Sequence, residues 1–149
     1  MLHKKLKLIA ALDRHTFLLF CESYLFLAWA RVLMFRPFAA IAPKLGDKTE
    51  ETAHHAGIAD LRKLQRISQA LMVVSRYTFW ESKCLVKAIA GSKMLERRKI
   101  DSTLYLGTAK DEEGKLIAHA WLRSGPMYIT GADVMEKFIV VQKFAKKAS

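Results

Sequence analysis

The chain has 149 residues, 52% of them apolar, and a net charge of +11 from 25 Lys and Arg against 14 Asp and Glu. This length and apolar content exclude a disordered chain and suit one domain that buries its own core. The basic residues are scattered along the chain, so we expect a basic surface or an acidic partner, and no nucleic acid. The two cysteines lack paired spacing, so we expect no disulfide framework and a cytoplasmic protein.

The N-terminal part of the chain is expected to be helical. Residues 2–12 are basic with an apolar edge, and a far more apolar helix follows over Phe17–Phe35, which Pro37 ends. Glu22 and Arg31 interrupt this apolar stretch, whereas a membrane span needs about 20 residues with few or no charges. We therefore expect a buried helix, or one that contacts a protein or a membrane surface, rather than a span.

The middle of the chain is expected to hold a connector and two helices. Residues 43–57 are polar, contain Pro and Gly, and lack periodicity, which predicts a connector. Apolar residues then recur at helical steps from Ile58 to Tyr77. Ser82 is a suitable N-cap for the next helix, which would place Cys84 at its second helical position.

Strand-like segments fill the C-terminal part, and the turn sequences DEEG and RSGP separate the first three. The segments cover Ser102–Ala109, Leu116–Arg123, Met127–Thr130 and Phe138–Phe144. Helices followed by antiparallel strands predict an α+β fold. We divide the chain into an N-terminal helical region (1–48), a connector (49–57) and a domain that carries the strands (58–149).

Cys84 lies in the first turn of its predicted helix. Free backbone N–H groups and the positive end of the helix dipole favour a thiolate there, and Lys83 adds positive charge. Such a sulfur can attack a carbonyl group while the N–H of Cys84 stabilises the oxyanion. The alternative is that Cys84 is one more small buried apolar residue, which is the interpretation that we give to Cys21 inside the apolar helix.

His119 lies in the middle of the strand-like stretch KLIAHAWLRSG. The two-residue period of a strand puts His119 and Trp121 on one face. Two interpretations remain open: a histidine packed in the core, or a base within reach of the Cys84 sulfur, because the order of the elements places both at one end of a sheet packed on a helix.

Several motifs follow one another in a fixed order: a Cys-Leu pair that opens a helix, LGT at the end of a strand, and AHAW on the next strand. The stretch LLFCESYLFLAWARVLMFRPFAAIAPKLG continues the pattern upstream, and YITGADVMEKFIVVQKF extends it downstream. This ordered set resembles the transglutaminase-like cysteine protease domain of lasso-peptide leader peptidases, the B2 proteins of bacterial lasso-peptide gene clusters. The resemblance covers nearly the whole chain.

The resemblance implies a transglutaminase-like or papain-like core, in which the helix that bears the cysteine packs on a small antiparallel sheet, with an N-terminal helical annex. It implies a cysteine endopeptidase that removes the leader from a ribosomally made lasso precursor peptide and frees the α-amine of the core peptide. By this carry-over Cys84 is the nucleophile and His119 the general base, with no cofactor and no metal.

The resemblance also implies partners. They are a separate small leader-recognition protein, because this chain is expected to be the split form without such a domain, and the lasso cyclase that closes the macrolactam ring. The apolar helix over Phe17–Phe35 is a candidate docking surface for the leader-recognition protein and the leader. Two other functions remain open: a non-catalytic scaffold of the same fold that binds leader or cyclase, and a membrane-surface protein.

A papain-type or transglutaminase-type triad also contains a carboxylate that orients the histidine, and the motifs do not identify this residue. The strand after His119 offers no acid, and Asp133, just past its end, is the nearest candidate, with Glu136 and Asp111 as fallbacks. Asp133 has the alternative role of capping the following turn. A dyad in which a backbone carbonyl orients the imidazole is the other alternative.

Three further residues are candidates for the oxyanion hole or for the wall of the active site. They are Trp80, Ser82 and Trp121. For Trp121 the alternative is plain core packing.

Overall fold

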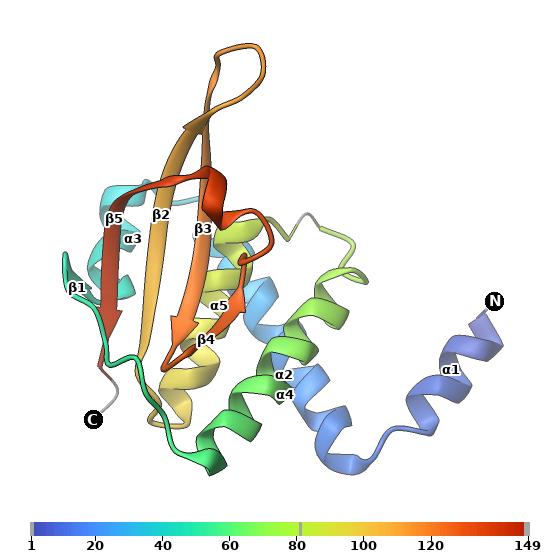
Figure 1. Ribbon diagram of the computed structural model, residues 1–149. Helices are drawn as coiled ribbons and strands as arrows, with labels where there is room; N and C mark the ends of the chain where they lie inside the picture. The colour runs from blue at the N-terminus through green and yellow to red at the C-terminus, as the bar shows by residue number, and fades with distance from the viewer. Residues whose placement is uncertain (1, 81, 148–149) are drawn as a thin grey trace.

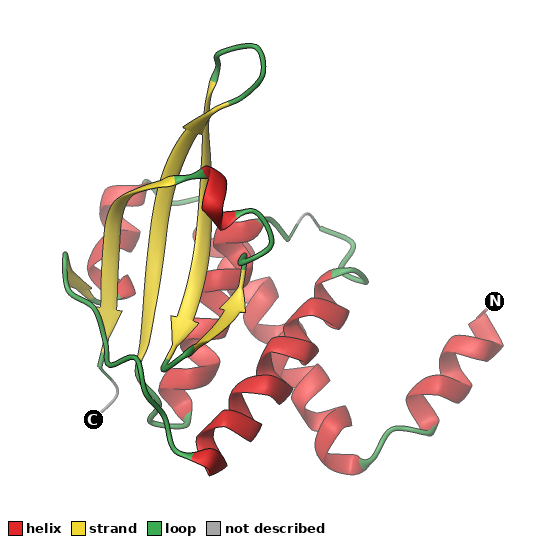
Figure 2. Cartoon of the chain, in the orientation of Figure 1, coloured by secondary structure: helices red, strands yellow, loops and turns green. Residues whose placement is uncertain are grey.

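A five-stranded sheet with helices on one side forms the body of the molecule (Figures 1 and 2). This computed structural model describes residues 2–80 and 82–147, except for the side chain of Ile9. The helices are α1 (Leu2–Ala10), α2 (Arg14–Leu33), α3 (Phe38–Leu45), α4 (Ile58–Ser75) and α5 (Cys84–Arg97), with a short 3-10 helix η1 (Met135–Lys137). The strands are β1 (Asp47–Lys48), β2 (Ser102–Lys110), β3 (Leu116–Ser124), β4 (Met127–Thr130) and β5 (Ile139–Lys146).

The sheet is antiparallel throughout, in the order β1-β5-β2-β3-β4. The hairpin of β2 and β3 projects beyond the rest of the sheet, and α1 stands apart from the body (Figure 1). The predicted α+β class is confirmed. The four predicted strands and the helix at Ile58 are also confirmed, because their apolar periods match the faces that the core buries.

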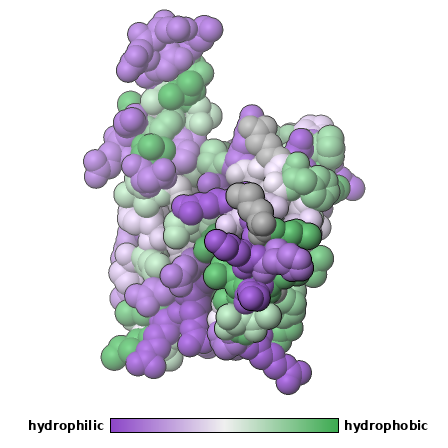
Figure 3. Space-filling view, turned by 90° about the vertical axis from the view of Figure 1, so that its right-hand side faces the viewer, coloured by the Kyte–Doolittle hydropathy of each residue, from purple (hydrophilic) through white to green (hydrophobic). Residues whose placement is uncertain are grey.

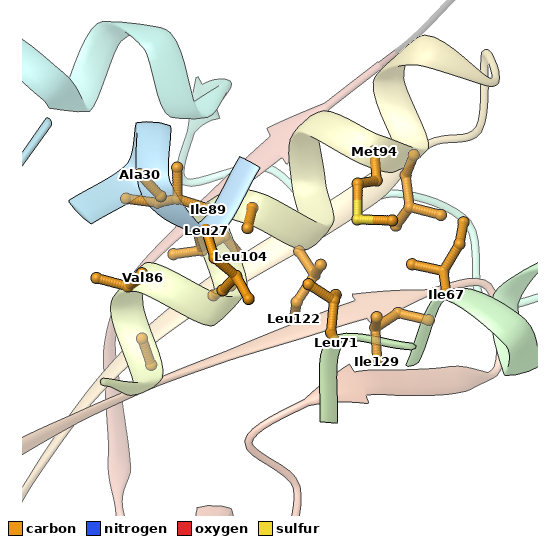
Figure 4. Close-up of a cluster of buried hydrophobic side chains, with 14 of the residues drawn as sticks. Leu27, Ala30, Ile67, Leu71, Val86, Ile89, Met94, Leu104, Leu122 and Ile129 are labelled. Carbon is orange, nitrogen blue, oxygen red and sulfur yellow. The ribbon is translucent and has the colours of Figure 1, made fainter. Parts of the chain in front are cut away.

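The core lies between one face of the sheet and the helices. A Cβ added to Gly91 of α5 would meet Leu122 of β3 at 2.8 Å and Leu71 of α4 at 3.0 Å, so three elements converge on that glycine. Figure 4 shows Leu27 of α2 and Ile89 of α5 close to Leu104 of β2. Because α2 packs on both α4 and α5, it forms an outer helical layer with one face turned away from the core.

Two sequence predictions about local structure are wrong. Ser82 does not cap α5: the N-cap is Lys83, and the hydroxyl of Ser82 lies 2.9 Å from that of Thr78 instead. The connector predicted over 43–57 begins too early, since its first residues complete α3. Ile41 and Leu45, four residues apart, bury one face of α3, and this burial outweighs the helix-breaking tendency of the proline between them.

A buried arginine fastens the segment before α4 to the sheet. Arg123 of β3 is only 2% exposed, and its guanidinium donates to the carbonyl oxygens of Thr52, Ala53 and Gly125. Its Nε donates to the hydroxyl of Tyr105 at 2.9 Å. The positive charge is thus balanced by polar oxygens, and none of the described carboxylates pairs with it.

We expect Arg123→Met to lower the free energy of unfolding by about 3–5 kcal/mol, because the three carbonyl groups lose their donor inside the protein. Urea titration followed by circular dichroism measures the change. Arg36→Met, at an exposed position, is the matched control and is expected to stay within about 0.5 kcal/mol of the wild type. Equal stability of the two variants would contradict the fastening role.

A second polar contact joins the outer helical layer to α5. Glu22 of α2 lies 2.7 Å from Arg97 and 2.7 Å from Arg98, at the end of α5. Burial by itself would raise the pKa of Glu22, but the hydrogen bonds and charges of Arg98 and Arg97 outweigh it and hold the pKa below its usual value. The carboxylate therefore contributes stability that is complete above its pKa in the unfolded chain and is lost as the pH falls through its lowered pKa in the folded state.

We expect Glu22→Gln to cost about 1–2 kcal/mol of stability at pH 7 and progressively less below pH 4.5, since protonated wild type resembles the variant. Urea titrations at pH 7 and pH 3 measure this. Glu113→Gln is the control, because Glu113 forms an exposed pair with Lys115. A cost for Glu22→Gln that does not change with pH would contradict the assignment.

Candidate active site

Cys84 is the first residue of α5. The next two turns of the helix pack into the core through four buried residues, Val86, Ala88, Ile89 and Ala90. The side chain of Cys84 is half-buried and rests against the same core. The sulfur therefore sits at the amino end of a helix that the sheet holds in place, where the helix dipole favours negative charge.

His119 is held by a backbone carbonyl. Its Nε2 lies 2.8 Å from the carbonyl oxygen of Gly131, in the loop after β4. A carbonyl oxygen only accepts hydrogen bonds, so Nε2 carries the proton and Nδ1 of the neutral ring keeps its lone pair. Among the described residues Nδ1 has no hydrogen-bond partner. The structure thus fixes the tautomer in which Nδ1 is the basic atom.

The amino end of α5 lies at the level of His119. The helix crosses β3 where Gly91 meets Leu122, and α5 and β3 run in the same direction (Figure 1). Cys84 precedes that crossing by seven helical residues and His119 by three strand residues, a distance of about 10 Å in each case. In the described part of the chain no hydrogen bond joins the Cys84 sulfur to the imidazole.

His119 and the helix lie on different sides of β3. Ala120 and Leu122 belong to the core on the helical side, and alternation turns His119 and Trp121 to the other face. The pairing of β3 with β4 ends where Leu122 meets Thr130, and Gly131 then lies against Ala120 and His119. Strand β3 therefore separates the imidazole from the sulfur.

A row of rings supports the imidazole. Trp121 stacks on Tyr105 with ring centroids 5.6 Å apart and on His119 with centroids 5.8 Å apart, and the Phe138 ring lies 5.0 Å from that of His119. Burial raises the pKa of Tyr105, which keeps its phenol neutral beside Arg123. The ring of His119 thus contacts two aromatic side chains.

Two glycines make room for this arrangement. At Gly107, directly opposite His119 on β2, a Cβ would meet the Trp121 ring at 2.8 Å and Phe138 at 2.9 Å. Gly131 has φ +77°, and a Cβ there would lie 2.5 Å from the carbonyl oxygen of Ala120. Only a glycine fits at position 131 without displacing the carbonyl group that binds His119.

Among the described residues, none of the predicted acids is hydrogen-bonded to the imidazole. Asp133 is exposed in the loop before η1, and it does not cap η1, whose N-cap is Val134 without a side-chain bond. Asp111 accepts from the backbone N–H groups of Glu113 and Lys115 and so shapes the turn of the β2–β3 hairpin. Of the two predicted ways to orient the ring, the structure contains the backbone carbonyl, while a catalytic role for Asp133 or Glu136 stays a prediction.

The other predicted wall residues fall into two groups. Trp121 lies beside His119, whereas Trp80 packs edge-on against Tyr24 of α2, with ring centroids 5.0 Å apart. Ser82 bonds within its own turn, to Thr78. Trp80 thus lies on the side of the helices, four residues before Cys84.

Two buried polar atoms have no hydrogen-bond partner within the described chain. They are Nε1 of Trp80 and Oγ1 of Thr130. In the sequence, Trp80 lies shortly before Cys84, and Thr130 directly precedes Gly131. Buried polar atoms without partners are uncommon, and functional sites are among the places where they occur. Thr130 and Phe138 were not predicted from the sequence, since a threonine and a phenylalanine in strand-like segments carry no signal beyond β propensity.

The described residues contain no cluster of three or more His, Cys, Asp or Glu side chains able to hold a metal ion. The candidate reactive groups are the Cys84 sulfur at a helix terminus and the His119 imidazole with its defined tautomer. Such a pair suits nucleophilic attack on a carbonyl carbon followed by proton transfer.

Comparison with known proteins agrees with this architecture. The model of the transglutaminase-like superfamily matches residues 25–143, from within α2 to within β5. No curated protein and no solved structure matches the chain. The superfamily includes cysteine proteases as well as transglutaminases. Because the family model spans well over half of the chain, this protein belongs to the transglutaminase-like superfamily.

Proposed function

We propose that this protein is a cysteine endopeptidase that removes the leader from a lasso precursor peptide. The observation that carries the proposal is the bond from His119 to the Gly131 carbonyl, which leaves Nδ1 as a base at the level of Cys84. The motif order that resembles lasso leader peptidases supplies the substrate class, and the surrounding superfamily includes enzymes with cysteine nucleophiles.

The proposed reaction uses these groups in order. Nδ1 of His119 takes the proton of the Cys84 thiol, and the sulfur attacks the carbonyl carbon at the leader–core junction to form a C–S bond. The backbone N–H of Cys84 stabilises the oxyanion. The C–N bond then breaks, the proton on His119 passes to the leaving α-amine of the core peptide, and water hydrolyses the thioester that remains on the leader.

This reaction needs the sulfur and Nδ1, which lie on different sides of β3, to approach each other when substrate binds. Catalytic hydrogen bonds are often long in enzymes without substrate and tighten when substrate binds. The proposed partners are a leader-recognition protein, which presents the precursor, and a cyclase, which consumes the freed amine.

We expect Cys84→Ala to reduce cleavage by at least about 10³-fold, because no other described side chain replaces the nucleophile. Mass spectrometry measures release of the core peptide from a cognate lasso precursor peptide, in the presence of its leader-recognition protein. Cys21→Ala is the matched control, since Cys21 lies on α2, and it is expected to cleave at the wild-type rate. Cleavage at the junction by Cys84→Ala would refute the mechanism.

A non-catalytic scaffold is the second candidate, favoured by the missing bond between Cys84 and His119. The rate of alkylation separates the two candidates in the Cys21→Ala background. A peptidase predicts that iodoacetamide modifies Cys84 faster than free cysteine at pH 7, because the helix terminus favours the reactive anion. Alkylation no faster than free cysteine, together with absent cleavage, would establish the scaffold.

We expect Gly131→Ala to lower cleavage about 10–100-fold, because the added Cβ displaces the carbonyl that fixes the tautomer of His119. The ¹⁵N chemical shifts of the ring, which distinguish protonated from bare nitrogen, are expected to lose the Nε2–H signature. Gly57→Ala is the control, since a Cβ at Gly57 meets nothing within 4 Å. An unchanged ring spectrum with lost activity would assign Gly131 a role other than orienting His119.

A further inference from the structure

The outward face of α2 is apolar from Leu18 to Val32. Leu18, Cys21, Leu25, Trp29 and Val32 recur at steps of three and four residues, and all five are exposed; we call them the outer stripe. Only 28% of the most apolar 18-residue window of α2 is buried, although the helix is long and apolar enough to cross a membrane. Figure 3 shows apolar residues gathered on the helical side of the molecule.

The opposite face of α2 is fixed in the protein. Leu19, Leu27 and Ala30 lie in the core, and Glu22 is paired with two arginines of α5. A helix that crosses a bilayer would have to carry this carboxylate into hydrocarbon, which is costly. The outer stripe is therefore suited to lie along a surface rather than to cross one.

Cations lie beside aromatic rings at the C-terminal end of α2 and occur on the helix before it. Lys93 Nζ lies 5.8 Å from the centroid of the Trp29 ring, and Arg31 lies 5.1 Å from that of Phe35. The preceding helix α1 is exposed and carries Lys4, Lys5 and Lys7. Lysine and arginine beside exposed aromatic rings are typical of surfaces that bind at the headgroup level of a membrane.

A cavity of about 280 Å³ adjoins the stripe at Trp29. Its walls include four apolar residues besides Trp29, namely Leu33, Ile41, Leu45 and Ile89. Its polar side chains are one serine, three lysines and one glutamate, namely Ser92, Lys44, Lys93, Lys146 and Glu96. Lys93 and Lys146 both pair with Glu96, and the lysines leave an excess of positive charge beside apolar walls. That combination suits an anionic headgroup above an acyl chain.

We propose that the outer stripe and the adjoining cavity dock this protein on an anionic membrane surface. The occupant is a lipid surface rather than a second copy, because two chains of net charge +11 repel each other and anionic lipid attracts both. The docking is independent of the peptidase reaction, since the stripe lies on the outer layer of helices and the imidazole lies beyond β3.

The test uses the full chain and sedimentation with vesicles of phosphatidylcholine alone or with 30% phosphatidylglycerol. We expect binding only to the anionic vesicles, weaker at 500 mM salt. Leu25→Glu with Val32→Glu, at positions 66% and 63% exposed, is expected to weaken that binding at least tenfold without unfolding the protein. Ile139→Glu, 75% exposed on β5, is the matched control and is expected to bind as the wild type does.

Other outcomes would overturn the proposal. Absent binding, or equal binding to both kinds of vesicle, would exclude an anionic surface. A dimer that the double variant dissociates would make a second copy the occupant. Loss of binding to the purified leader-recognition protein in the double variant, with no vesicle binding by the wild type, would make that protein the occupant. Circular dichroism of each variant checks that the fold persists.

Discussion

The two faces of β3 are the constraint on which this structure depends. Ala120 and Leu122 turn to the helices and complete the core that holds α5, while His119, Trp121 and Arg123 turn to the other face. Because the strand period is two, a shift of one residue would bury the imidazole among helices and place Leu122 in the row of rings. The position of the helix that starts at Cys84 and the orientation of the histidine are thus set by one strand and its register.

The loop after β4 completes this arrangement without an acid. The carbonyl oxygen of Gly131 accepts the hydrogen bond from Nε2–H of His119 and so orients the imidazole. Because this acceptor is neutral, it places no negative charge beside the ring. A carboxylate would stabilise the imidazolium more strongly, which favours proton removal from the thiol. The carbonyl instead depends on the backbone conformation at Gly131, whose positive φ and crowded surroundings no other residue accommodates. The geometry of the candidate site therefore depends on Gly131 as much as on the side chain of His119.

Much of the fold follows from periodicity alone, and the site follows only in part. The strands at Ser102, Leu116, Met127 and Phe138 are evident because alternation and turn residues act locally. The sequence predicts Ser82 as the cap of α5 because serine is a common N-cap residue, but the cap is Lys83. The hydroxyl of Ser82 is hydrogen-bonded to that of Thr78 instead. The Phe138 ring and the Gly131 carbonyl approach His119 through the tertiary course of a loop, which no local pattern encodes. The sequence thus points to Cys84 and His119 as candidates but not to the groups that hold the imidazole in place.

Helix α2 shows the same limit on a larger scale. Its apolar residues run all round, a pattern shared by buried helices and membrane segments, so composition alone does not decide which face is covered. The ion pair of Glu22 with Arg97 and Arg98 decides it, because the one acid of the helix points to α5 and fixes the rotation of the helix about its axis. Once that rotation is set, the outer stripe must face outward, with Lys93 beside it. A salt bridge in the protein thus determines which apolar surface is offered to the outside.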